Sequence, residues 1–68
     1  MDDQERLQEA LKHEENAVRL YRKYQRECDD GRLSEMFEQF AMNESWHASA
    51  LRAKLEKMSG QGEQNEGG

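Results

Sequence analysis

The sequence contains no proline and only one cysteine, and its glycines are concentrated at one end. Four of the five glycines fall within the last ten residues, so Gly31 is the only one among the first 58. Long stretches without helix-breaking residues are typical of helices, whereas sheets require frequent turns. The sequence therefore predicts an all-α protein made of two long helices, followed by a short Gly-rich tail.

Long apolar runs and basic clusters are missing as well. Hydrophobic residues make up 34% of the chain and charged residues 37%, and no apolar run is long enough to cross a bilayer. The net charge of -5 arises from ten basic and fifteen acidic residues, with no basic face. These properties argue against nucleic acid and against an anionic membrane as partners.

The single cysteine and the first residues bear on the cellular location. Cys28 has no partner in the chain with which to form a disulfide, which is typical of a reducing compartment. The first ten residues are acidic and polar, a composition unlike that of a secretory signal peptide. We therefore expect a cytoplasmic protein.

The spacing of apolar residues predicts helices over about residues 3–29 and 33–58, with a disordered polar tail over 59–68. Gly31 can adopt a positive φ in the tight connection between the helices. The candidates for the helix caps are Asp2, Asp3, Asp30 and Ser34.

Each predicted helix carries an apolar stripe with the three- and four-residue spacing of antiparallel bundles. The stripe of the first helix consists of Leu7, Leu11, Val18, Tyr21 and Cys28. The stripe of the second consists of Leu33, Met36, Phe37, Phe40, Ala41, Ala48, Leu51, Leu55 and Met58. A lone hairpin would leave its apolar face in water. We therefore expect two hairpins to dimerise into a four-helix bundle, or to assemble into a ring of dimers.

Three ionisable residues, Glu14, Glu44 and His47, occupy stripe positions. Glu14 and His47 lie equally far from the predicted turn, and Glu44 precedes His47 by three residues on the same helix face. Burying these groups unpaired would cost several kcal/mol each, on the order given for isolated polar groups and charges. Carboxylate oxygens and an imidazole nitrogen at one level are instead suited to a divalent metal ion. A two-fold axis would bring a second set to the same place.

The stretches "EENAVRLY" and "MFEQFAMNESWHASAL" resemble one half of a ferritin-like or rubrerythrin domain. As in that family, the helix-A glutamate, Glu14, precedes a tyrosine, Tyr21, by seven residues. The second helix is similar to the family pattern F-E-x-x-A-x-x-E-x-x-H, which ends here at Glu44 and His47. The usual members hold two such hairpins and this chain holds one, and in this respect it resembles the encapsulated ferritins, short ferritin-like proteins whose di-iron site forms between two subunits.

The resemblance implies a ferroxidase, which oxidises Fe(II) with oxygen or peroxide at a di-iron site between two subunits. Glu14, Glu44 and His47 would be the metal ligands, with two irons at each dimer interface, and Tyr21 would hydrogen-bond a ligand carboxylate. It further implies iron storage or detoxification, with an encapsulin shell as a partner and its interior as the location. The tail contains no apolar shell-targeting peptide, and the sequence has no Cys-x-x-Cys pair for a rubredoxin module.

Two other functions fit the same residues. The polar stripe residues could set the register of a purely structural or interaction module of four helices. The site could also hold Zn, Mn or Ca without oxidase activity.

Residues beside the predicted ligands have an ordinary interpretation as well. His13 and Glu15 are expected on a solvated face, with Glu15 paired to Arg19, and the alternative is a role in iron entry. Trp46 points off the stripe and is expected to anchor an interface between subunits.

Overall fold

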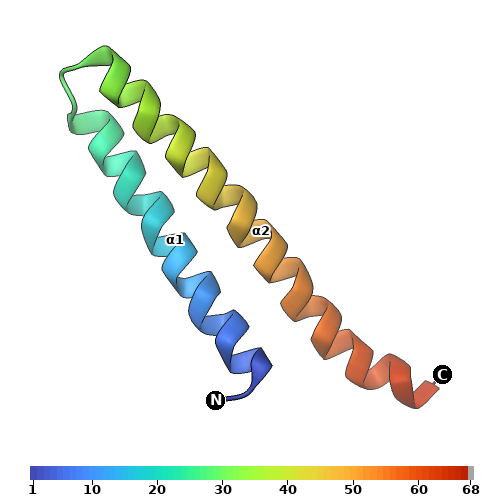
Figure 1. Ribbon diagram of the computed structural model, residues 1–68. Coiled ribbons are helices and arrows are strands. Elements are labelled where there is room, and N and C mark those ends of the chain that lie inside the picture. The colour runs from blue at the N-terminus through green and yellow to red at the C-terminus, as the bar shows by residue number, and fades with distance from the viewer. Residues whose placement is uncertain (68) are drawn as a thin grey trace.

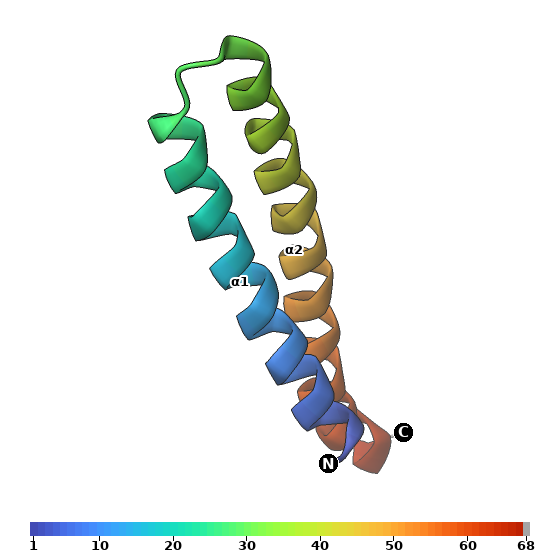
Figure 2. The same ribbon diagram turned by 60° about the vertical axis from the view of Figure 1, so that its left-hand side comes forward.

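The computed structural model describes the backbone of residues 1–67 and the side chains of residues 1–60. Two helices, α1 (Asp3–Glu27) and α2 (Gly31–Gly67), lie side by side and run in opposite directions (Figures 1 and 2). The predicted all-α antiparallel hairpin is therefore confirmed.

Helix α1 begins with a reciprocal pair of hydrogen bonds between its cap and its first turn. The Asp2 carboxylate accepts a hydrogen bond from the backbone N–H of Glu5 at 2.8 Å, and the Glu5 carboxylate accepts one from the N–H of Asp2 at 3.1 Å. This capping box satisfies backbone N–H donors that a helix start otherwise leaves unpaired. Its two carboxylates also interact favourably with the positive end of the helix dipole. Of the predicted cap candidates at this end, Asp2 is the cap.

The connection between the helices lies two residues earlier in the chain than the sequence predicts, at residues 28–30 instead of 30–32. Helix α1 ends at Glu27, and its capping residue, Cys28, is extended, with φ of -73° and ψ of 134°. Helix α2 begins at Gly31, and no residue described in the structure has a positive φ. The expected left-handed role of Gly31 is therefore wrong, because Gly31 is the first residue of α2 and the chain reverses through residues 28–30 without a positive φ.

Two side chains hold the start of α2 in place. The Asp30 carboxylate accepts a hydrogen bond from the backbone N–H of Leu33 at 2.9 Å, so Asp30 is the N-cap. The Ser34 hydroxyl donates to the backbone carbonyl of Gln25 at 3.0 Å, which ties the first turn of α2 to the last turns of α1. Ser34 therefore joins the two helices and does not cap the second one.

The Asp30 cap yields a stability prediction. We expect Asp30→Ala to lower the free energy of unfolding by about 1 kcal/mol, the usual effect of removing a side-chain N-cap. Asp29→Ala is the matched control, because Asp29 is also exposed in the connection but caps no helix. Urea unfolding at one protein concentration measures both effects, and equal losses for the two variants would contradict the assignment.

The C-terminal end differs from the prediction. Helix α2 does not stop near Met58 but extends to Gly67, Gly68 lies outside the described residues, and the predicted disorder of the tail over 59–68 stays a prediction. Gly60 and Gly62 each disfavour a helix by about 1 kcal/mol relative to alanine. The segment has no proline, however, and its glutamine and glutamate residues favour helix, so glycine content alone did not locate the helix end.

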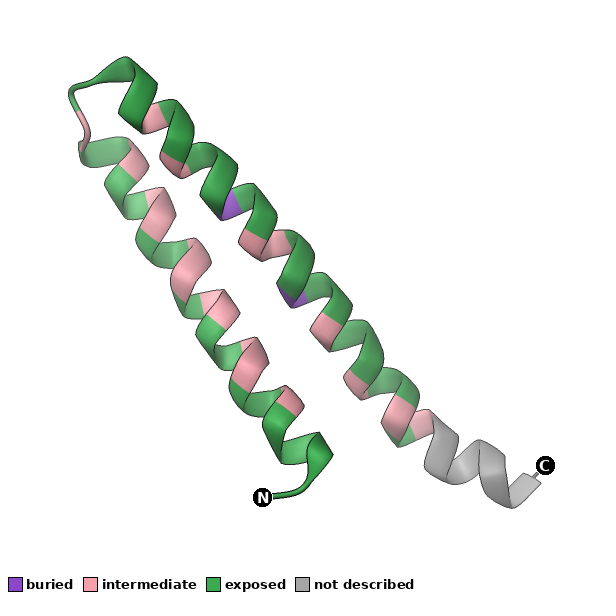
Figure 3. Cartoon of the chain, in the orientation of Figure 1, coloured by how far each residue is buried: buried purple, intermediate pink, exposed green. Residues whose placement is uncertain are grey.

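The hairpin is a single layer of helices with very little interior. Its dimensions are 55 × 22 × 11 Å, and the smallest equals the diameter of one helix. Among residues 1–60 the only buried hydrophobic residues are Ala41 and Ala48, both on the side of α2 that faces α1 (Figure 3). No helix in the described part of the chain is long and apolar enough to cross a membrane.

Many large apolar side chains consequently remain in contact with water. Eight are exposed, namely Met1, Leu20, Tyr24, Leu33, Met36, Phe40, Met42 and Trp46. A stable domain usually covers most side chains of this kind, and the hairpin alone has no second layer with which to do so.

Candidate metal centre

The three predicted ligands lie together midway along the hairpin. Helix α1 supplies Glu14, and helix α2 supplies Glu44 and His47. Each offers one ligand atom, and these atoms all lie within 4.8 Å of one another. Among residues 1–60, whose side chains are described, no other group of three Asp, Glu, His or Cys residues lies close enough together to hold a metal ion. The antiparallel register predicted from the sequence does bring them to one level.

The imidazole of His47 faces the two carboxylates through its Nδ1 atom. Nδ1 lies 2.7 Å from Oε1 of Glu44, which is a hydrogen bond, and 3.7 Å from Oε2 of Glu14, which is too long for one. A divalent metal would replace the proton between His47 and Glu44, because a ligating nitrogen must be deprotonated. Nδ1 is therefore the nitrogen that the fold presents to an ion.

Glu14 is electrostatically unsatisfied. Its Oε2 atom is buried and has no hydrogen-bond partner among the described residues. Burial of the carboxyl group, followed by the neighbouring Glu44 carboxylate, raises the pKa of Glu14 above its ordinary value of 4.5, and His47 only partly offsets this. A buried acceptor beside a second carboxylate lacks a positive charge, which a cation would supply.

The spacing of the ligand atoms fits one metal ion per hairpin. Oxygen and nitrogen ligands lie at about 2.0–2.2 Å from a transition metal, so atoms on opposite sides of one ion are about 4.4 Å apart at most. The observed upper limit of 4.8 Å requires only small movements of the side chains. The donor set, two carboxylates and an imidazole, is typical of iron, manganese and zinc sites.

Aromatic residues flank this cluster on the side towards the turn. Tyr21 stacks on Phe37 with ring centroids 6.0 Å apart and contacts Phe40 at 5.5 Å. A hollow of about 250 Å³ is lined by Tyr21, Phe40, Asn43, Glu44 and His47, so Tyr21 lies beside two of the candidate ligands. The side chains described include no hydrogen bond from Tyr21 to a ligand carboxylate. Its predicted role as a hydrogen-bond donor stays a prediction.

The cluster is open on one side. The His47 side chain is 63% exposed, while those of Glu14 and Glu44 are 24% and 26% exposed. Exposed Leu33, Met36 and Phe40 precede Glu44 and His47 at helical spacing on α2, so they share one face with the ligands. We call this surface, with Glu14, Tyr21 and Tyr24 of α1, the ligand face. It combines an incomplete set of metal ligands with uncovered apolar groups.

His13 and Glu15, the residues next to Glu14 in the sequence, lie outside the ligand cluster. Glu15 does not pair with Arg19 as expected, because its carboxylate accepts a hydrogen bond from Arg52 of α2 at 3.0 Å. Arg19 instead donates to the side chain of Asn16. Glu15 thus lines a different groove from the hollow at Glu44 and His47, and His13 is exposed. An entry role for His13 or Glu15 remains a prediction.

The raised pKa of Glu14 predicts how the metal-free protein responds to pH. The folded protein holds the Glu14 proton more tightly than the unfolded chain does, so its contribution to stability is complete below pH 4.5. That contribution is lost as the pH rises through the raised pKa of the folded state. Glu14→Gln, which cannot ionise, should therefore become progressively more stable than the metal-free wild type above pH 4.5. Urea unfolding across this range measures the difference, and a constant difference would contradict the prediction.

The sequence was compared with known protein families, and one family model matches nearly the whole chain. A protein-family model described as Rubrerythrin matches residues 5–67, which include both helices and all three candidate ligands. A search of curated proteins and a search of solved structures give no match.

Proposed function

The chain belongs to the rubrerythrin family, and we propose that it is a ferroxidase-type iron protein whose di-iron site forms between two copies of the chain. The observation that carries this proposal is the convergence of Glu14, Glu44 and His47 on an open, apolar face. Three ligands from one hairpin leave coordination positions unfilled. A second hairpin, placed against the same face, would cover the apolar groups and supply ligands of its own.

Charge balance supports two metal ions in such a pair. Two hairpins bring together four carboxylates, from two copies each of Glu14 and Glu44, and two neutral imidazoles from His47. Four negative charges in a partly dry site repel one another, and two divalent cations neutralise them. The same ligands would accept Zn, Mn or Ca, so the proposal that iron is the functional metal rests on the family.

Ferrous iron is the substrate, and the two ions of a site together give up two electrons, which with two protons reduce dioxygen to hydrogen peroxide or hydrogen peroxide to two water molecules. The residues of the chain hold and orient the metal. Glu14 and Glu44 provide anionic oxygens, which favour the more highly charged ferric product over ferrous ions. His47 provides a neutral nitrogen, fixed by its place one helical turn after Glu44. The aromatic side chains of Tyr21 and Phe40 would limit access of water on the side towards the turn.

Anaerobic loading with Fe(II), followed by air, tests the proposal. We expect the wild type to bind about one iron per chain and then to develop ferric absorbance, whereas Glu44→Ala and His47→Ala should do neither. Glu56→Ala is the matched control, because Glu56 is an exposed carboxylate on the same helix and away from the cluster. Wild type that binds no iron would contradict the metal site. Binding with no ferric product would instead favour a site that carries no redox chemistry.

The fate of the iron is a further part of the proposal. A layer of helices 11 Å thick encloses no space for a mineral, so ferric product must be deposited elsewhere. We propose storage or detoxification in the cytoplasm, with delivery into an encapsulin shell as the resemblance to encapsulated ferritins implies. Copurification with a shell protein at native expression levels tests this step. Its failure would leave the ferroxidase proposal intact.

A further inference from the structure

An aromatic row leads from the metal cluster towards the turn of the hairpin. It begins at Tyr21, which lines the hollow at Glu44 and His47. The ring of Tyr21 stacks on that of Phe37, with centroids 6.0 Å apart, and the ring of Phe37 contacts that of Tyr24, with centroids 5.3 Å apart. Tyr24 lies on a second hollow, of about 260 Å³, next to the connection between the helices. The row therefore joins the cluster to the end of the hairpin.

The two tyrosines in this row can pass on an electron. Tyrosine carries a phenolic O–H, and this group gives up an electron together with its proton far more readily than the plain ring of phenylalanine does. Tyr21 and Tyr24 are three residues apart on α1, so they are neighbours on the helix surface, and Phe37 packs against both. Glu27 lines the hollow at Tyr24, where its carboxylate can accept the phenolic proton. An electron that Tyr21 loses can therefore be replaced from Tyr24.

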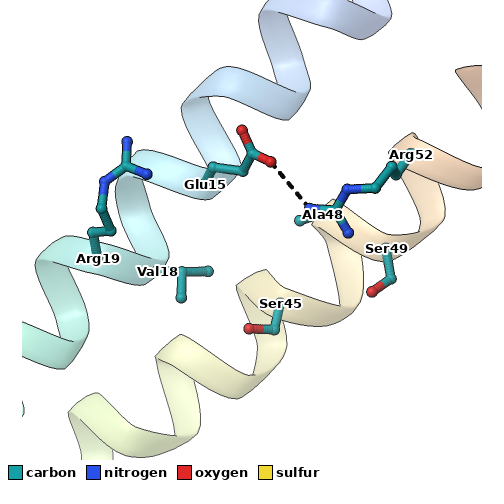
Figure 4. A pocket seen from close by; sticks show the side chains of 7 residues that line it. All are labelled: Glu15, Val18, Arg19, Ser45, Ala48, Ser49 and Arg52. Atoms are coloured by element: carbon teal, nitrogen blue, oxygen red, sulfur yellow. Dashed lines mark hydrogen bonds and ion pairs between the residues drawn. The ribbon is translucent and has the colours of Figure 1, made fainter.

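The other surroundings of the cluster offer no comparable path. The groove between the helices at Glu15 is lined otherwise by Val18, Ala48, two serines and two arginines (Figure 4). None of these side chains gives up an electron readily. Trp46 is next to His47 in the sequence, but one residue turns a helical side chain by about 100°, and Trp46 makes no aromatic contact among the side chains of residues 1–60. The aromatic row is therefore the path by which an electron reaches the cluster.

We propose that Tyr24 is a reserve electron donor, acting through Tyr21 when hydrogen peroxide reaches a site that holds one ferrous ion instead of two. This inference rests on the proposed ferroxidase function. Hydrogen peroxide needs two electrons to become water, and one ferrous ion supplies only one. One peroxide, one ferrous ion, one tyrosine phenol and one proton then yield two water molecules, one ferric ion and one tyrosyl radical. Without the tyrosine, the same encounter releases a hydroxyl radical among the ligands.

Hydrogen peroxide added to the full chain, loaded anaerobically with one Fe(II) for every two chains, tests the donor. In the wild type we expect a tyrosyl radical by freeze-quenched electron paramagnetic resonance, and little oxidation of His47 in peptide mass mapping. Tyr21→Phe should abolish the radical and raise oxidation of His47 several-fold. Tyr24→Phe should confine the radical to Tyr21, which changes the hyperfine pattern because that pattern follows the orientation of the ring. Trp46→Phe is the matched control, an aromatic change outside the row, and should alter neither result.

Two results would overturn the proposal. One is ferric product without a tyrosyl radical in the wild type, which would mean that no tyrosine donates. The other is the same radical spectrum in Tyr24→Phe as in the wild type, which would make Tyr21 the only donor. The wild type loaded with one Fe(II) per chain and exposed to air is measured in parallel. There iron supplies both electrons, so we expect ferric product and no radical. Absence of ferric product in that sample would identify a failure of the ferroxidase proposal itself.

Discussion

Zinc added to the metal-free protein is expected to raise the melting temperature by about 10–20 °C, and Glu44→Ala or His47→Ala should abolish the increase. A ligand that binds only the folded state at a hundred times its Kd stabilises it by about 2.7 kcal/mol. For domains of about 60–100 residues, each kcal/mol corresponds to roughly 4–8 °C. Zinc serves as the probe because it prefers the same donors and undergoes no oxidation.

Each variant removes one of the three converging ligand atoms. The carboxylate charge that remains in the cluster is then left without a partner. Glu56→Ala should retain the full increase, because it changes the net charge as Glu44→Ala does without touching the cluster. Thermal unfolding is followed by circular dichroism at one chain concentration. An equal increase in wild type and in His47→Ala would show that zinc binds elsewhere.

Phe40→Asp should abolish assembly through the ligand face and weaken metal binding by at least about 100-fold, although Phe40 is not a ligand. In one hairpin Phe40 is 39% exposed and touches Tyr21 and Phe37 with ring centroids 5.5 and 6.2 Å apart. A carboxylate tolerates that half-exposed position, but burial against a partner without a counter-charge costs several kcal/mol. Each 1.4 kcal/mol is about tenfold in affinity.

The matched control for this variant is Gln39→Asp, a change to the same residue at an exposed neighbouring position that is turned away from the ligand face. Light scattering gives the mass of each variant and zinc titration gives its affinity. If Phe40→Asp becomes monomeric and still binds zinc as tightly as the wild type, one hairpin suffices for the site. The proposed role of the second copy would then be wrong.

Helical periodicity and chain reversal were enough to predict the hairpin and the convergence of the ligands. Glu14 and Glu44 lie equally far from the observed connection, and His47 follows Glu44 by one helical turn, so antiparallel pairing brings the three close together, whatever their side-chain conformations. The aromatic stripe was predicted for the same reason, because Tyr21, Phe37 and Phe40 follow the spacing that faces a partner helix. Their roles as ligands and neighbours of a metal remain predictions.

Other features depend on small energy differences that spacing does not resolve. Glu15 has Arg19 four residues away on its own helix and Arg52 across the hairpin, and such exposed ion pairs differ by only about 0.5 kcal/mol. The end of α2 was misjudged because glycine is disfavoured in helices without being excluded from them. The groove at Ser45, Ala48 and Ser49 arises from the way these small residues of α2 face Val18 of α1, a matter of packing between helices.

The central claim, that the metal site belongs to a pair of chains, is tested most directly by native mass spectrometry during anaerobic titration with Fe(II). The account predicts that iron is found in species with an even number of chains, with two irons for each pair, and that monomers carry none. Glu14, which supplies the buried carboxylate from α1, should be needed for this pattern, so Glu14→Gln should yield iron-free species. Monomers carrying one tightly bound iron would contradict the account.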